Sequence, residues 1–230
     1  MNSLCILLFY SGRNLFRTLL NPRGVTVLSK DREFYWRRLH SLLGIIPVGL
    51  FLTQHLVVNH FATRGEEAFN AATHFMESLP FKIFLEIFVI FLPLMFHAFY
   101  GLYIAFTAKN NTKNFGTLRN YLFVLQRFTG IFLVVFIIWH VFETRFQAAI
   151  GAKEVNFNMM AEILSNPWML GFYIVGVISA TFHFANGIWS FLVSWGITQS
   201  AQSQKIATYV TLVIFLALSV VGVQALLAFV

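Results

Sequence analysis

The chain has 230 residues, of which 58% are hydrophobic, 17% aromatic and only 11% charged. Its mean hydropathy is +0.72, which excludes an ordinary soluble domain and predicts an integral membrane protein. The net charge of +7 does not indicate nucleic-acid binding, because the basic residues cluster at the ends of apolar segments and form no continuous basic face. The single cysteine, Cys5, excludes a disulfide framework and a thiolate metal site.

Residues 1–30 contain a short apolar run, Leu4 to Tyr10, that is too short to cross a membrane. Three interpretations of this segment stay open: an interfacial amphipathic piece, a flexible tail, or non-native residues that an upstream start codon adds. We favour a weakly ordered tail, followed by a single membrane domain at residues 31–230.

Five apolar segments are long enough to cross a bilayer, which takes about 20 mostly apolar residues each. They predict an all-α integral membrane fold with five transmembrane helices. The expected spans are 38–61, 83–107, 121–142, 168–195 and 206–229. The N-terminal segment, the Lys109–Arg119 loop and the loop before span five carry most of the basic residues and fall on one side. By the positive-inside rule that side is cytoplasmic, so we expect the N-terminus there.

Four of the seven histidines fall well inside spans one to four, one in each span, and polar residues in a membrane usually face a partner or a cavity. At 1.5 Å per helical residue, His55 and His140 lie ~13 Å and ~8 Å from the outer ends of their spans. His97 and His183 lie roughly 22 Å and 24 Å from those ends. The four therefore sort into an inner pair, His97 and His183, in the cytoplasmic half, and an outer pair, His55 and His140.

Glycines accompany these histidines. Gly101 and Gly187 each follow an inner histidine by four residues, which places them on the same helix face and leaves room beside the imidazole for a flat ligand. Gly44 and Gly130 belong to a second, looser pattern, in which an outer histidine follows eleven or ten residues later.

Haem with two neutral imidazole ligands is the natural flat ligand for such histidines, and the chain lacks the Cys-x-x-Cys-His motif of covalent attachment. We therefore expect two non-covalent b-type haems in a haem-binding four-helix core formed by spans one to four, with span five peripheral. For any one histidine alone, hydrogen-bonded packing is an equally good interpretation.

Other polar residues in or near the spans have two interpretations each. Arg38 and Arg127 lie about one turn from the cytoplasmic ends of spans, where they could extend to lipid headgroups or pair with a haem propionate. His40 could meet a partner subunit or a propionate. Glu86 and Glu143, near the outer ends of spans two and three, could be solvated or relay protons.

From about residue 31 to the C-terminus, the chain closely resembles the dihaem cytochrome b membrane-anchor subunits of succinate dehydrogenase from Bacillus-type bacteria. The stretches that carry the resemblance are EFYWRRLHSLLG at 33–44, QHLVVNHF at 54–61, GFYIVGV at 171–177 and FHF at 182–184. The resemblance implies that His55, His97, His140 and His183 are the axial ligands of two haems, in the pairs given above.

The same resemblance implies a bacterial cytoplasmic-membrane anchor for a flavoprotein subunit and an iron–sulfur subunit on the cytoplasmic side. Electrons from succinate would pass through the iron–sulfur clusters and the inner and outer haems to menaquinone. The chain itself would hold no catalytic residue for succinate, and the sequence assigns no residue to the quinone site.

Three alternatives stay open at this stage. The chain could anchor a fumarate reductase, although spans four and five have no convincing counterpart of the transmembrane acidic residue that dihaem fumarate reductase anchors use. It could be a haem-free membrane scaffold or transporter whose histidines pack or carry protons. It could also be the cytochrome b partner of a hydrogenase or a formate dehydrogenase.

Overall fold

The computed structural model describes residues 22–109 and 111–230, with the side chains of 32–109 and 111–230. Of the tail expected at residues 1–30, residues 1–21 lie outside the described residues. The rest of it belongs to helix α2 (Pro22–Ile45). The chain divides into two compact units, residues 1–39 and 40–230. In the first unit, the Arg37 guanidinium donates two hydrogen bonds to Glu33, at 2.9 and 2.7 Å, one helical turn away.

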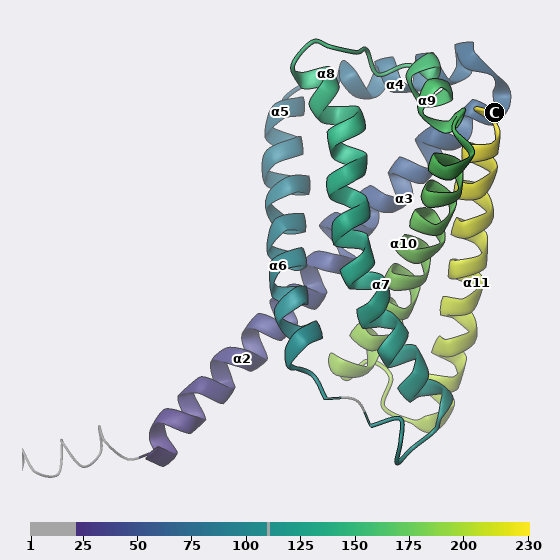
Figure 1. The fold of residues 1–230 in the computed structure, drawn as a ribbon. Coiled ribbons are helices and arrows are strands. Elements are labelled where there is room, and N and C mark those ends of the chain that lie inside the picture. Colours follow the sequence, from purple (N-terminus) through teal and green to yellow (C-terminus); the bar gives the residue numbers. More distant parts are fainter. Residues whose placement is uncertain (1–21, 110) are drawn as a thin grey trace, which may run out of the picture. The chain divides into compact units, whose positions relative to one another are not determined.

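Every regular element in the described part of the chain is helical (Figure 1). After α2, the elements in chain order are α3 (Pro47–His60), η1 (Phe61–Arg64), α4 (Glu66–Glu77), α5 (Lys82–Phe84), η2 (Leu85–Phe91), α6 (Leu92–Thr107), α7 (Leu118–Val141), η3 (Phe142–Phe146), α8 (Gln147–Ala149), α9 (Phe157–Leu164), α10 (Pro167–Ser194) and α11 (Ala201–Leu227).

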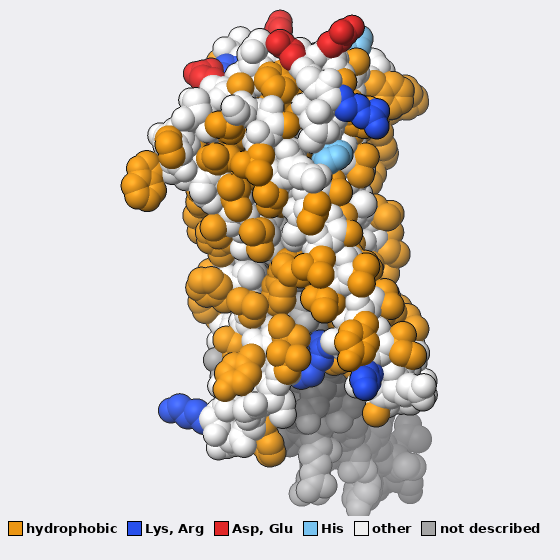
Figure 2. All heavy atoms as spheres, turned by 90° about the vertical axis from the view of Figure 1, so that its right-hand side faces the viewer, with side chains coloured by type: hydrophobic (Ala, Val, Ile, Leu, Met, Phe, Trp, Pro, Cys, Tyr) orange, Lys and Arg blue, Asp and Glu red, His pale blue; other side chains and the backbone are white. Residues whose placement is uncertain are grey.

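Within residues 22–109 and 111–230, five helical stretches are long and apolar enough to cross a membrane, which confirms the predicted number of spans. Their bounds are Arg32–Arg64, Lys82–Thr107, Leu118–Ala149, Pro167–Ser194 and Ala201–Leu227. Few of their side chains are buried, and the rest are half-buried or exposed. Figure 2 shows the apolar ones as a broad hydrophobic band between one end that carries the acidic side chains with some Lys and Arg, and an opposite end where Lys and Arg are seen. Such a surface suits a bilayer and not water.

Two spans contain π-helical segments, η2 in the second span and η3 at the end of the third. A π-helical turn holds one extra residue and so changes the direction in which the next side chains point, and such turns are frequent at functional sites. In span one, α2 ends at Ile45 and α3 begins at Pro47, because proline has no backbone N–H to continue the helix.

Helix α10 lies between α7 and α11, and α11 also packs against α3. A cluster of buried hydrophobic residues lies at the end of the bundle where α4 and α9 lie (Figure 1). The buried members of this cluster are Ala62, Phe69, Leu133, Phe136, Met160, Leu164, Tyr173, Leu226 and Phe229. The two short helices are joined by a hydrogen bond from the Phe157 N–H to Asn70 Oδ1, at 2.8 Å. Together they shield this end of the bundle from water.

Gly176 on α10 tests how tightly this cluster is packed. A Cβ at this position would lie 2.3 Å from Phe136 Cε2, so we expect Gly176→Ala to lower the free energy of unfolding by about 1–3 kcal/mol. Gly171→Ala on the same helix is the matched control, since a Cβ there meets nothing within 4 Å. Thermal unfolding in detergent should show a lower midpoint for Gly176→Ala and no loss for Gly171→Ala. Equal midpoints would contradict the packing described here.

Candidate functional site

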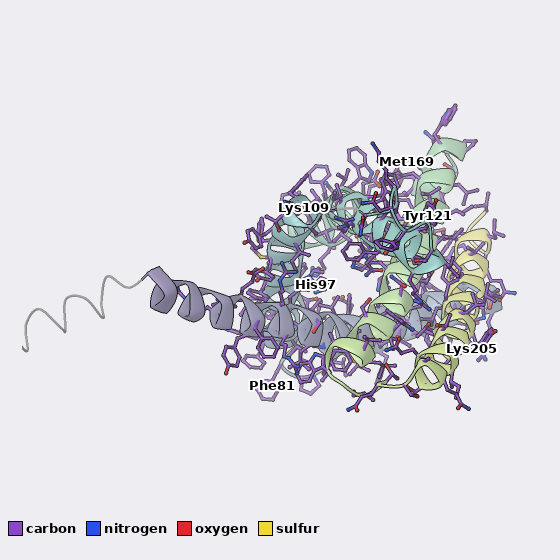
Figure 3. The ribbon with its side chains drawn as sticks, turned by 90° about the horizontal axis from the view of Figure 1, so that it is seen from below. Phe81, His97, Lys109, Tyr121, Met169 and Lys205 are labelled. Atoms are coloured by element: carbon purple, nitrogen blue, oxygen red, sulfur yellow. The ribbon has the colours of Figure 1, made fainter. Side chains whose placement is uncertain are left out.

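The inner histidines face each other across the bundle. His97 on α6 and His183 on α10 have ring centroids 6.1 Å apart, with ring planes at 88° to each other. Figure 3, which looks along the bundle, shows His97 among the helices and not on their outer surface. Two helices that are distant in sequence thus bring two imidazoles together in the apolar interior.

A backbone carbonyl and a glycine from a neighbouring helix hold each inner ring. His97 Nδ1 donates to the His40 carbonyl at 2.9 Å, and a Cβ on Gly44 would lie 2.4 Å from His97 Cε1. The arrangement recurs at His183, with the Gln126 carbonyl at 3.1 Å and Gly130, whose Cβ would lie 3.0 Å from the ring. In both cases the glycine is four residues after the carbonyl. Without a side chain there, the ring can reach the backbone.

These hydrogen bonds fix the tautomer of the inner histidines. A carbonyl oxygen can only accept, so Nδ1 carries the proton and Nε2 has a free lone pair. A neutral imidazole with a free Nε2 is the form that binds a metal, and metal-binding histidines usually donate their other N–H in this way.

A cluster of polar side chains between α7 and α10 lies beside His183. Gln126 Nε2 donates to the His183 carbonyl at 3.0 Å, and Asn186 Nδ2 donates to Gln126 Oε1 at 2.8 Å. The Thr129 hydroxyl lies 3.3 Å from His183 Nδ1. A Cβ on the predicted site residue Gly187 would lie 3.7 Å from Gln126 Nε2. These contacts join the two helices beside the inner pair.

His40 and Gly101 lie on the other side of the inner pair. The His40 ring stacks on the His97 ring with centroids 4.1 Å apart and planes within 7° of parallel. A Cβ on Gly101 would lie 3.1 Å from His40 Nε2. All four predicted glycines therefore lie around the inner pair, and Gly44 and Gly130 each contact the histidine of another helix.

The two predicted arginines are in different units. Arg38 belongs to residues 1–39, and its guanidinium lies over the Phe34 ring at 4.5 Å from the centroid. Arg127 is one turn before Gly130 on α7, and its Nη1 donates to the Ala108 carbonyl at 2.8 Å. Its Nη2 is buried and has no hydrogen-bond partner within the described part of the chain. That nitrogen could bind the carboxylate of a bound group.

The outer histidines form the second pair. His55 on α3 and His140 on α7 have ring centroids 5.8 Å apart, with planes at 77°. Asn59 Nδ2 lies 3.4 Å from His55 Nε2, but it donates a shorter hydrogen bond, of 2.8 Å, to the His55 carbonyl. The Asn59 amide is therefore hydrogen-bonded to the backbone and does not need the His55 ring as an acceptor. The Phe136 ring lies nearly parallel to His140, at 11° and 5.9 Å between centroids.

Side chains take the place of carbonyls behind His140. The Tyr173 hydroxyl donates to Glu143 Oε2 at 3.2 Å, and lies 3.4 Å from His140 Nδ1. Nearby, Arg145 donates two hydrogen bonds, at 3.0 and 2.8 Å, to the carboxylate of Glu86. Glu86 and Glu143, for which the sequence left two interpretations open, thus differ. Glu86 is ion-paired, and Glu143 accepts a hydrogen bond from a buried tyrosine.

The two pairs lie at different levels along the bundle. On α7, Gly130 contacts His183 of the inner pair, and His140 of the outer pair follows ten residues later, about 15 Å along the axis. The α2–α3 segment gives a similar separation, with Gly44 at the inner pair and His55 eleven residues on, about 16 Å.

The two-histidine geometry suits a metal that carries its own equatorial ligands. Two metal–nitrogen bonds of about 2 Å, plus about 1 Å from each nitrogen to its ring centroid, give about 6 Å between centroids, as in both pairs. Among the described residues there is no group of three or more His, Cys, Asp and Glu side chains that could hold a metal ion alone. A closed tetrahedral site is therefore not formed by these residues.

The structure brings the four predicted histidines together in the two predicted pairs, and their role as ligands stays a prediction. The sequence reasoning missed several neighbours, namely Asn59, Gln126, Thr129, Tyr173 and Asn186. Each is a polar residue within an apolar span, and the cost of burying such residues was the signal that could have found them.

Comparisons with known proteins agree on one family. A family model described as succinate dehydrogenase/fumarate reductase transmembrane subunit matches residues 116–222. The succinate dehydrogenase cytochrome b558 subunit of Bacillus subtilis (strain 168) is 68% identical over 203 residues, which are 88% of this chain and 100% of that protein. The succinate dehydrogenase hydrophobic membrane anchor subunit of Thermoplasma acidophilum is 26% identical over 95 residues, 41% of this chain and 73% of that protein.

The contact between Gln126 and Asn186 can be tested by mutation. Gln126→Leu leaves Asn186 Nδ2 and the His183 carbonyl without this partner, so we expect it to lower the free energy of unfolding by about 1–3 kcal/mol. With Asn186→Leu added, the double variant should lose less than the sum of the single losses, because the two side chains interact. Gln199→Leu, at an exposed turn, is the control and should change stability by less than about 0.5 kcal/mol. Additive losses would show that the two side chains act independently.

Proposed function

Because this chain belongs to the family of succinate dehydrogenase cytochrome b transmembrane subunits, we propose that it is the membrane-anchor and electron-transfer subunit of a succinate dehydrogenase. It would fix a flavoprotein subunit and an iron–sulfur subunit to the cytoplasmic face of the bacterial membrane and deliver their electrons to menaquinone. The N-terminus would be cytoplasmic, on the side with most of the basic loop residues.

The observation that carries this proposal is the pair of facing histidines at each of two levels. Centroid separations of 6.1 and 5.8 Å fit an iron between two imidazoles, and the four histidines come from four different spans. We propose that His97 and His183 hold one b-type haem and that His55 and His140 hold the other. When bound, the haems would supply one-electron carriers at both levels of the bundle.

The surrounding residues prepare the histidines for this role. The carbonyls of His40 and Gln126 keep the inner rings in the tautomer with a free Nε2, and Gly44 and Gly130 let those rings reach the backbone. Gly101 and Gly187 keep bulk away from the neighbouring turns. The buried Nη2 of Arg127 would neutralise a haem propionate, and Arg38 stays a second candidate for this contact.

The separation between the levels has a consequence for energy. About 15 Å along α7 is half of the ~30 Å hydrocarbon core, so the two levels together reach well across the membrane. Displacing one electron through a potential difference of 100 mV is worth about 2.3 kcal/mol. An inside-negative potential would therefore assist transfer from a cytoplasmic partner toward a quinone near the outer face.

The same family includes anchors of fumarate reductases, so fumarate reduction is the second candidate. The described Glu86 and Glu143 side chains are already bonded to Arg145 and Tyr173, and both lie at span ends and not in the middle of the bilayer. Comparing succinate:menaquinone and menaquinol:fumarate rates of the purified complex would separate the two directions.

Haem content is the first test of the proposal. Reduced-minus-oxidised spectra with pyridine-haemochrome quantitation should give two b-type haems per chain. Alanine at His97 or His183 should remove one haem, and alanine at His55 or His140 should remove the other, because each pair shares one iron. His74→Ala is the control, since His74 is exposed on α4 and should keep both haems.

Other outcomes would count against the proposal. Wild-type protein without haem would contradict electron transfer and favour a scaffold or a transporter. Losses that group differently, for example His97 with His140, would contradict the assignment of the ligands.

Gly44 gives an independent test of the inner site. In Gly44→Ala the new Cβ would come within 2.4 Å of His97 Cε1, so the ring must shift away from the His40 carbonyl. Loss of such a supporting bond typically lowers metal affinity about 10- to 100-fold, so inner haem occupancy should fall while the outer haem stays. Gly171→Ala should keep both haems, since a Cβ there meets nothing within 4 Å. Full occupancy in Gly44→Ala would exclude the proposed role of Gly44.

A further inference from the structure

A chain of hydrogen bonds runs from the outer histidine of α7 to a carboxylate. The Tyr173 hydroxyl has one proton, which it donates to Glu143 Oε2 at 3.2 Å, so it can only accept from His140 Nδ1, which lies 3.4 Å away. The order of donation is therefore His140 to Tyr173 to Glu143. This series of hydrogen bonds fixes the proton on Nδ1 of His140, as the carbonyls do for the inner histidines.

Packing holds the tyrosine in this position. Its side chain belongs to the buried cluster beneath α4 and α9 and is only 2% exposed. The Phe136 ring meets it edge-on, with centroids 5.4 Å apart and planes at 80°. Gly176, one turn later on α10, is what lets Phe136 fit there, since a Cβ would lie 2.3 Å from that ring. The hydroxyl therefore has little freedom to choose another partner.

The π-helical segment η3 supplies the carboxylate. His140 is followed within five residues by Glu143 and Arg145, which bond to different helices. Glu143 accepts from Tyr173 on α10, whereas Arg145 pairs with Glu86 on η2 at 2.8 Å. In the described part of the chain, Glu143 has no cationic partner within 4.0 Å. Its charge thus acts on the tyrosine hydroxyl without a neighbouring salt bridge to offset it.

His140 consequently differs from the two inner histidines in what accepts its Nδ1 proton. Both inner histidines donate to neutral backbone carbonyls, while His140 donates to a hydroxyl that is itself bonded to an anion. Hydrogen bonds polarise one another along such a chain. A stronger acceptor behind an imidazole raises its basicity as a metal ligand, which favours the higher oxidation state of the metal.

We propose that Tyr173, backed by Glu143, is a positioning residue that orients the His140 imidazole and lowers the reduction potential of the outer haem relative to a site without this bond. The proposal rests on the proposed function, because it presupposes haem at the outer pair. It goes beyond that function by assigning control of one potential to two residues that are not ligands. The inner haem would not be subject to this control.

Redox titration of the purified three-subunit complex, loaded with haem, tests the proposal. Tyr173→Phe removes only the hydroxyl, so the ring packing stays and His140 Nδ1 loses its acceptor. We expect one of the two haem transitions to move to higher potential, with the ratio of reduced to oxidised haem at a fixed potential rising roughly three- to tenfold. For a one-electron couple, tenfold corresponds to about 59 mV.

A spectroscopic signature accompanies the potential. The low-spin ferric EPR signal of a haem with two histidine ligands depends on the angle between the imidazole planes. Without its bond to Tyr173, His140 can rotate, so the largest g value of one haem should shift and that of the other should not. A purely structural role for the tyrosine would change stability without a selective change in one signal.

Two further variants sharpen the test. Glu143→Gln keeps an acceptor for the tyrosine hydroxyl and removes the charge, so the same transition should rise by a smaller amount with the EPR signal unchanged. Thr129→Val removes the hydroxyl 3.3 Å from His183 Nδ1 and is the matched control for the inner pair. Thr129→Val should not change the potential of the haem transition that Tyr173→Phe shifts.

The outcomes separate the two levels of inference. Wild-type complex with fewer than two haems overturns the proposed function itself. Two haems with unchanged potentials and EPR signals in Tyr173→Phe overturn only the role of Tyr173. The role of Tyr173 is also overturned if Tyr173→Phe and Thr129→Val shift the same haem transition. If Tyr173→Phe yields no loaded complex, Glu143→Gln decides, and an unchanged outer potential in that variant overturns the proposal.

Discussion

An imidazole in the middle of a bilayer must donate its N–H to the protein, because no water is available and an unbonded polar group there costs several kcal/mol. For the inner histidines the acceptor is a carbonyl of another helix, and a helix carbonyl is accessible only if the neighbouring surface is free of side chains. This single requirement explains why Gly44 follows His40 by four residues and why Gly130 follows Gln126 by four. The glycines are thus part of the histidine sites although they lie on other helices.

His140 of the outer pair meets the same requirement with a side chain. His140 is the penultimate residue of α7, where the helix passes into the π-helical η3, and a tyrosine of α10 accepts its proton. Side-chain acceptors are adjustable in a way that carbonyls are not, since their strength depends on what they bond to in turn. The α4 and α9 helices cover this end of the bundle, which keeps water from competing for the Tyr173 hydroxyl. The inner histidines therefore have fixed backbone acceptors, whereas the strength of the acceptor of His140 depends on the charge of a neighbouring side chain.

Sequence reasoning predicted the elements and the pairing of the histidines because both depend on position along a single helix. Five apolar runs predicted five spans, and residue counts from the span ends sorted the histidines by depth. It did not predict that Gly44 and Gly130 contact His97 and His183, because spacing within one helix carries no information on which neighbour packs there. For the same reason Gln126 and Tyr173 went unnoticed, since their partners lie on α10 and α7, 57 and 33 residues away in sequence.

Helix α7 determines the geometry of both levels at once. It carries Gly130 and the Gln126 carbonyl, which hold His183 of the inner pair, and ten residues beyond Gly130 it supplies His140 to the outer pair. The α2–α3 segment has the same double role through Gly44 and His55, but it is interrupted at Ile46 and Pro47, whereas α7 is continuous from Leu118 to Val141. The distance between the levels is therefore set by the regular rise of α7, about 15 Å over those ten residues, and the interrupted span can adjust to it. A fixed separation of this kind is what a chain needs if two redox groups are to exchange electrons at a constant distance while lipid surrounds the bundle.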